Sequence, residues 1–189
     1  MTEKEAPAKR PKLTLAEFDA LPDDGERREL LDGAVLVKPS PEAVRQRAAG
    51  QLALQLPATC PEQLEVFFAP FDYRPSDRTC LQPDLMVCRV EDVEDDKVRR
   101  PLLLAVEILS PSTRAMDLLK KRRTYEEAGV GSYWIFEPEE AVLTVLELES
   151  GRYVERTFKD DEVFEATRPY PMRIVPGELV RRTNRSAVQ

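Results

Sequence analysis

The spacing of apolar residues along the chain alternates between a helical and an extended period. Val44, Ala48 and Leu52 recur every four positions, which predicts an amphipathic helix over residues 41–56. Apolar runs bounded by turn-forming residues predict strands within residues 64–75, 79–90, 102–108 and 132–136. The charged stretch at residues 91–100 lies between two of these runs and indicates a solvated loop.

Local turn and capping signals divide the rest of the chain. Thr14, followed three residues later by Glu17, matches a capping box and predicts a short helix that ends near residue 21. Hairpins are predicted over residues 27–39 and 141–158, because each contains a short polar turn whose second residue is glycine. A further helix is predicted over residues 114–128, directly before a glycine.

The order of these elements is helix, hairpin, helix, strands, helix, strands. It predicts an α/β (α+β) fold in which helices flank a mixed β-sheet core, with additional N-terminal and C-terminal hairpins. No repeat or linker interrupts the pattern, so residues 13–180 are expected to form a single domain. Residues 1–12 are expected to be a disordered tail and residues 181–189 a frayed basic tail.

Composition narrows the class of protein. The chain has 189 residues, of which 42% are apolar and 33% charged, as in ordinary globular proteins. No apolar run is long enough to cross a membrane, and the N-terminus lacks the apolar segment of a signal peptide, so a cytoplasmic protein is expected. The three cysteines show no C-x-x-C spacing and are interpreted as reduced core thiols.

Two global features restrict the chemistry. The chain contains no histidine, which excludes Ser-His-Asp and Cys-His catalysis and imidazole-ligated metal sites. The formal net charge of −7 argues against tight, non-specific binding of nucleic acids. Any catalysis must therefore rely on carboxylates, lysine, tyrosine or a hard metal ion.

Glu107 is the one charged residue in the most apolar predicted strand. Burying an unpaired carboxylate costs several kcal/mol or raises its pKa until it is neutral. A salt bridge, a hydrogen bond to its protonated form, or a shared metal ion could each hold it there. Asp84 also leads into an apolar strand, 23 residues earlier (107 minus 84), so the two strands can lie side by side. Two acids at matching levels of neighbouring strands repel each other unless a cation lies between them.

The predicted helix after Glu107 supplies an amine. Asp117, Lys121 and Tyr125 are spaced by four residues and share one helix face, which can fold back along the strand. Two acids and a lysine suit Mg²⁺-dependent cleavage of a phosphodiester. The acids bind the ion, and the lysine orients or deprotonates a water and offsets charge developing on the phosphate. Lys120 is the competing candidate for the lysine.

Six segments, in order over residues 13–180, resemble the bacterial Uma-two family of restriction-endonuclease-like proteins within the PD-(D/E)xK nuclease superfamily. They are LTLAEFDALPDDGERRELLDGAVL, FFAPFDYRPSD, QPDLMV, VEILSPST, DLLKKRRTYEEAGVGSYWIFEP and PGELV. The resemblance implies a restriction-endonuclease-like core. It also implies that Asp84 and Glu107 are metal ligands, with the backbone carbonyl of Ile108 completing the metal shell, and that Lys121 is the catalytic lysine.

The resemblance extends to residues around this centre. Glu29, in ELLDG, corresponds to an additional acid facing the site, and Gln46 corresponds to a recurrent glutamine of the second helix. The chain departs from the pattern at Leu109, where the superfamily's usual lysine would stand, and at Arg45, where the family has histidine. Arg45, Gln46 and Arg122 are therefore expected to contact substrate.

Structural alternatives exist for each candidate. Glu107 could pair with an arginine from residues 99–100 or 122–123, Asp84 could be a turn-forming acid, and Glu29 could pair with Arg27 or Arg28. Lys121 could be a solvated residue of a charged run. Tyr125 is interpreted as a core residue.

The expected function is Mg²⁺-dependent hydrolysis of DNA, with Mn²⁺ able to substitute. Basic residues at 114, 120–123 and 181–185 suggest a phosphate-facing patch, weak DNA affinity and steep salt dependence. A homodimer is expected because two sites suit cleavage of both strands. The alternative is a catalytically silent nuclease-fold module that acts through protein interactions. Recognition sequence and a choice between DNA and RNA do not follow from the sequence.

Overall fold

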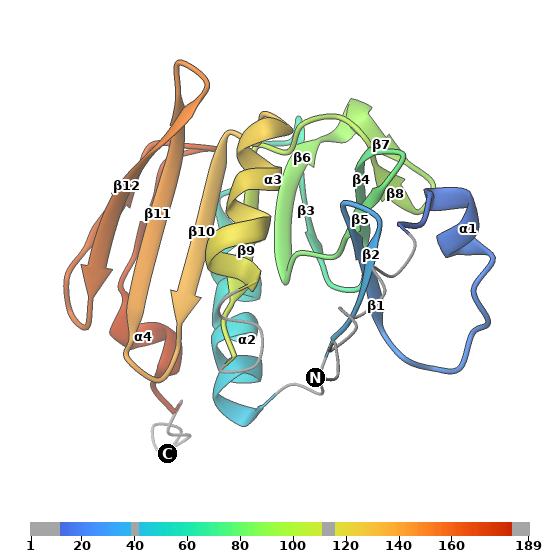
Figure 1. Ribbon diagram of the computed structural model, residues 1–189. Helices are drawn as coiled ribbons and strands as arrows, with labels where there is room; N and C mark the ends of the chain where they lie inside the picture. Colours follow the sequence, from blue (N-terminus) through green and yellow to red (C-terminus); the bar gives the residue numbers. More distant parts are fainter. Residues whose placement is uncertain (1–11, 39–41, 111–115, 183–189) are drawn as a thin grey trace, which may run out of the picture.

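The computed structural model describes residues 12–38, 42–110 and 116–182, which form two six-stranded sheets with helices packed against them (Figure 1). The expected tail at residues 1–12 lies almost wholly outside the described residues, as does most of the tail at 181–189. No helix in the described part of the chain is long and apolar enough to span a membrane.

One of the two six-stranded sheets is mixed and has Glu107 on one of its central strands. β9, Leu104–Ile108, pairs in parallel with β10, Ser132–Glu137, and antiparallel with β6, Leu85–Arg89. The full order is β12 (Arg152–Lys159), β11 (Val142–Glu149), β10, β9, β6 and β3 (Leu64–Phe68). All five residues of β9 are buried, which confirms that the strand is covered on both faces.

Helices cover the two faces of this sheet (Figure 1). Leu104, Val106 and Ile108 pack in one core with α2, Ala43–Ala58, which contributes Ala48, Leu52 and Leu56. Alternation along β9 turns Ala105 and Leu109 into the second core, where Tyr125 of α3, Arg122–Glu127, is buried. Glu107 has the same parity as Ala105 and therefore faces α3.

The second sheet brings the N-terminal hairpin to the α3 face. Its order is β2 (Ala34–Val37), β1 (Arg28–Leu31), β5 (Thr79–Leu81), β4 (Asp72–Ser76), β8 (Lys97–Val98) and β7 (Val93–Glu94). The predicted turn is confirmed: Asp32 and Gly33 both have positive φ, which suits a tight two-residue turn, and Leu31 pairs with Ala34.

The loop predicted at residues 91–100 is more ordered than expected. It contains the 3₁₀ turn η1, Val90–Asp92, and the short hairpin β7–β8, and the side chain of Val98 is fully buried. Charged neighbours concealed this structure, because only Val98 and the partly buried Val93 of the stretch pack against the core.

The remaining expected elements are present with altered bounds. α1, Leu15–Asp19, has the predicted capping box with Thr14 and Glu17. Residues 116–121 form a π-helical segment, η2 (Met116–Lys121), before α3, whereas one helix was expected over 114–128. β11 and β12 form the expected hairpin, and the C-terminal part forms β13 (Phe164–Ala166), β14 (Met172–Ile174) and α4 (Pro176–Val180).

Candidate active site

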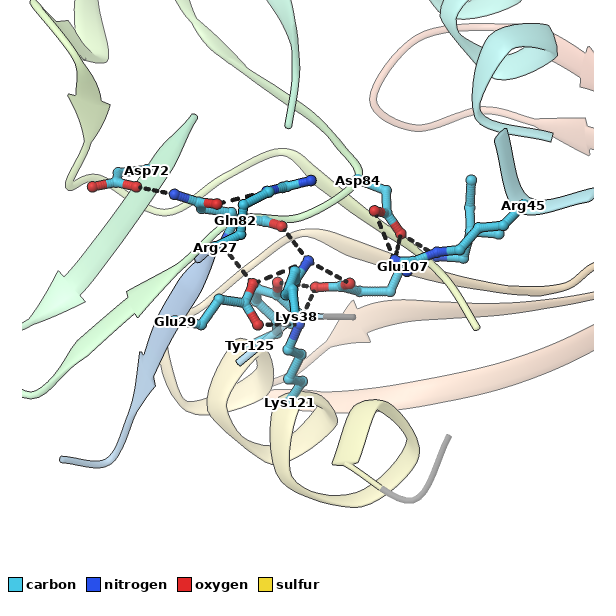
Figure 2. Close-up of polar contacts among 11 residues, drawn as sticks. Arg27, Glu29, Lys38, Arg45, Asp72, Gln82, Asp84, Glu107, Lys121 and Tyr125 are labelled. Carbon is cyan, nitrogen blue, oxygen red and sulfur yellow. Dashed lines mark hydrogen bonds and ion pairs between the residues drawn. The ribbon is translucent and has the colours of Figure 1, made fainter. Parts of the chain in front are cut away.

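Two carboxylates and two amines meet between the sheets and η2 (Figure 2). Lys121 Nζ lies 2.7 Å from Glu107 Oε1 and 2.9 Å from Glu29 Oε2. Lys38 Nζ lies 3.2 Å from Glu29 Oε1 and 3.7 Å from Glu107 Oε2. Each lysine therefore bridges both acids, and the four side chains form a closed ring of alternating charge.

Burial makes this charge balance necessary. The side chains of Glu29, Glu107 and Lys121 are 1–2% exposed and that of Lys38 is 7% exposed. An unpaired ion at such positions costs several kcal/mol, so removing one member leaves an opposite charge uncompensated. The ring accounts for a charged residue in the most apolar strand of the chain.

Tyr125 completes the surroundings of Glu107. Its hydroxyl donates a hydrogen bond of 3.0 Å to Glu107 Oε1. Burial alone would raise the pKa of Glu107, but Lys121, Lys38 and the hydrogen bonds outweigh it, so this pKa lies below its ordinary value. Burial and the neighbouring Glu107 carboxylate hold the pKa of Tyr125 well above its ordinary value. Glu107 is thus ionised and Tyr125 neutral at pH 7.

Elements far apart in the sequence position these groups. β1 carries Glu29, the residue after β2 is Lys38, and β9 carries Glu107. Lys121 ends η2, and the predicted four-residue step to Tyr125 places both side chains on Glu107. The structure separates the two candidate lysines, because Lys121 is buried whereas Lys120 is exposed.

Asp84 lies beside this ring but has different partners. The register Leu85 to Val106 places Asp84 one step before β6, at the level of Glu107 on β9. Its Oδ2 accepts a 2.8 Å hydrogen bond from the backbone N–H of Ile108, and Nη2 of Arg45 lies 2.9 and 2.8 Å from its two oxygens. Figure 2 shows the Asp84 carboxylate directed at Arg45 and the Glu107 carboxylate directed at the lysines.

The donor atoms suit a hard divalent cation, although protein cations hold them in this arrangement. Carboxylates on adjacent strands and a nearby backbone carbonyl are the oxygen ligands that Mg²⁺ prefers. Within the described residues, no three His, Cys, Asp or Glu side chains converge as a ready-made metal cluster. An ion bound by Asp84 would have to take the place of the Arg45 guanidinium.

The structure decides two of the pairing alternatives. Glu107 pairs with Lys121 and Lys38, so the arginine partners considered at residues 99–100 and 122–123 are wrong. Glu29 pairs with the same lysines, so pairing with Arg27 or Arg28 is wrong as well.

The residues expected to contact substrate are dispersed. Arg45 is 7% exposed and bound to Asp84, and Gln46 is exposed on the next position of α2. Arg122 is instead paired with Glu155 of β12, at 2.6 Å. These three side chains do not form one surface.

Sequence reasoning missed Lys38 and Gln82. Lys38 Nζ donates a 2.7 Å hydrogen bond to the Gln82 carbonyl, and the Gln82 N–H donates one of 2.7 Å to Glu29 Oε1. A lysine that follows an amphipathic strand is ordinarily exposed, so no local signal identified it. Lys38 is buried because the β1–β2 hairpin packs close to β9, which carries Glu107.

A mixed sheet that carries buried carboxylates beside a lysine is the arrangement expected for a restriction-endonuclease-like fold. Residues 15–175 match the Uma2 family, which is described as "Putative restriction endonuclease". Because the match covers most of the chain, the chain belongs to this family, as its motifs indicated.

The fold is shared with a solved structure. The crystal structure of "a putative nuclease belonging to DUF820" from Anabaena variabilis superimposes with a TM-score of 0.72 at 19% sequence identity. The match covers 89% of this chain and 97% of the other and confirms the expected fold. No curated protein matches the chain.

Proposed function

We propose that the protein is a Mg²⁺-dependent endonuclease that hydrolyses phosphodiester bonds of DNA. The observation that carries the proposal is the position of Lys121, which contacts Glu107 and Glu29 while Asp84 lies on the neighbouring strand at the level of Glu107. Membership of a family described as "Putative restriction endonuclease" supports the same chemistry.

The proposed roles follow from these positions. Asp84, Glu107 and the Ile108 carbonyl would hold Mg²⁺, which when bound activates a water and neutralises charge on the phosphate. Lys121 would orient the attacking water and stabilise the negative charge that develops during in-line attack. Glu29, which lies 2.9 Å from Lys121 Nζ, would help to keep Lys121 in place. The products would be 5′-phosphate and 3′-hydroxyl ends.

Nicking of supercoiled plasmid in Mg²⁺ or Mn²⁺ tests the proposal. Wild type is expected to nick, and Asp84→Ala to lose the activity because a metal ligand is gone. Asp161→Ala is the matched control, since this acid pairs with Arg181 on the surface with its side chain 80% exposed. Equal nicking by wild type and Asp84→Ala, or no nicking by either across a broad range of conditions, would contradict the proposal.

A second candidate is a catalytically silent interaction module. It is favoured by the charge balance of the centre, where Lys38, Arg45 and Lys121 neutralise Glu29, Asp84 and Glu107 without a metal ion. Isothermal titration with Mn²⁺ separates the two. Binding that disappears in Glu107→Gln supports the enzyme, and the absence of binding supports the module.

The homodimer stays a prediction, for which sedimentation velocity of the full chain is the direct test. Two subunits would present two centres to the two strands of a duplex. Sedimentation as a monomer at micromolar concentration would leave each chain to cleave a single strand.

A further inference from the structure

A groove of about 520 Å³ is lined by α1 and the segment that leads to β1, by the β3–β4 connection and by the β5–β6 connection. Its lining includes Phe18, Leu21, Glu26 and Arg27 from the first of these segments, together with Pro70 and Gln82 from the two connections. None of these residues belongs to the ring of charges or to the Asp84–Arg45 pair, so the groove is a separate feature of the surface.

The backbone joins this groove to the candidate active site. Gln82 lines the groove, and its N–H and carbonyl are the groups bonded to Glu29 and Lys38 at 2.7 Å each. The residue before Pro70, Ala69, donates its N–H to the Asp84 carbonyl at 3.1 Å. Gln82 precedes the proposed metal ligand Asp84 by two residues, so a ligand in the groove would contact the chain segment that leads to the proposed metal site.

Arg27 lines the groove and forms no ion pair with the described residues. Among the described residues its guanidinium meets only the neutral Gln82 Oε1, at 3.4 Å, and the two side chains lie together in Figure 2. The neighbouring Arg28 is instead held by Asp24, Glu26 and the Pro22 carbonyl. Of the two acids that line the groove, Glu26 lies 3.3 Å from Arg28, and Asp23 accepts the Gly25 N–H, a neutral donor that leaves its charge in place.

We infer that this groove binds the sugar–phosphate backbone of a nucleic-acid strand next to the cleavage site, and that Arg27 contacts one of its phosphates. The inference rests on the proposed nuclease function and identifies a substrate subsite for it. The partly exposed ring of Phe18 and the exposed ring of Pro70 offer apolar surface to sugars. An exposed arginine beside a neutral amide can turn toward a phosphate without breaking an ion pair.

The experiment is fluorescence-anisotropy titration of a labelled DNA duplex, and of the same labelled single strand, in EDTA over a series of salt concentrations. Arg27→Gln should weaken binding about tenfold at low salt. It should also lower the slope of log K against log salt by about 0.9 for a duplex or 0.7 for a single strand, the amount for one phosphate contact. Inorganic phosphate should compete only in the millimolar range, since it would fill one contact.

Arg168→Gln is the matched control, because this exposed arginine also donates to a neutral acceptor, the Leu148 carbonyl at 3.3 Å, but at the end of β11. Its affinity and salt slope should equal those of wild type. Wild-type binding that Arg27→Gln leaves unchanged would overturn the subsite and leave the nuclease proposal intact. Absence of binding to both DNAs by wild type would overturn the subsite and count against the nuclease as well.

Discussion

Replacing Arg45 with glutamine should increase the affinity of the protein for Mn²⁺ if the proposed metal site is correct. Arg45 Nη2 contacts both oxygens of Asp84, at 2.9 and 2.8 Å, and the two side chains are only 8% and 13% exposed. A divalent ion that coordinates Asp84 needs those oxygens. Arg45 therefore competes with the metal for one ligand.

The size of the effect follows from these distances. An ion at about 2.1 Å from an Asp84 oxygen would lie roughly 5 Å from a guanidinium left in place. Repulsion between charges of +2 and +1 at that separation is about 7 kcal/mol for an effective dielectric constant of about 20, so both cations cannot stay. Before a metal ion binds, the wild type must break the Asp84–Arg45 pair, and breaking a charged hydrogen-bonded pair costs about 1.5–3 kcal/mol. Arg45→Gln avoids this cost, so its affinity for Mn²⁺ should be roughly 10- to 100-fold higher.

Isothermal titration of Mn²⁺ into the full-length chain measures this gain. Arg47→Gln is the control on the same helix, because Arg47 donates to a neutral acceptor, the Val180 carbonyl at 3.4 Å. Asp84→Asn should abolish binding in either background. If Arg45→Gln binds Mn²⁺ no more tightly than wild type while Asp84→Asn still abolishes binding, the competition between Arg45 and the metal is refuted.

Three further outcomes are expected. Lys121→Met should lower the free energy of unfolding by about 3–5 kcal/mol in urea titrations, because it strips a cation from buried Glu29 and Glu107, whereas Lys120→Met should change it little. The pKa of Glu107 is lower in the folded protein than its ordinary value of about 4.3, so ionised Glu107 stabilises the fold fully above that pH. This stabilisation is lost as the pH falls below about 4.3 through the lowered pKa. Urea midpoints that fall equally between pH 5 and 3 in wild type and in Glu107→Gln would contradict this prediction. Burial raises the pKa of the Cys88 thiol to about 12, so it should react with a thiol reagent only after unfolding, and rapid labelling of the native chain at Cys88 would show an opening that the structure lacks.

Local rules predicted the parts of the site that one element or one pair of strands determines. An uninterrupted apolar run placed Glu107 in a covered strand, and the apolar segment after Asp84 placed that acid at the start of the neighbouring strand. The four-residue helical step selected Lys121 over Lys120 and brought Tyr125 to the same carboxylate. Each of these features depends on neighbours within a strand, a helix turn or one strand pair.

The cations that neutralise the site could not be predicted in the same way. Lys38 and Glu107 are 69 residues apart (107 minus 38) and meet because the hairpin of one sheet covers the end of the other. The apolar spacing of α2 does not distinguish Arg45 from the other polar residues of the helix. Arg45 pairs with Asp84 because of how α2 lies relative to β6. Long side chains of this kind depend on how whole layers pack, which periodicity does not encode.

This charge balance also changes how the acidity of the protein bears on nucleic-acid binding. The site itself carries no excess negative charge, since three acids there meet three cations. Removing these from the 35 acids and 28 bases of the chain leaves 32 and 25, so the whole net charge of −7 lies outside the site. A nucleic acid would approach a surface that repels it on average, and binding would depend on a few uncommitted cations such as Arg27. The affinity for nucleic acid should therefore be weak. Replacing a single arginine should lower it strongly, because each arginine provides a large share of a small number of phosphate contacts.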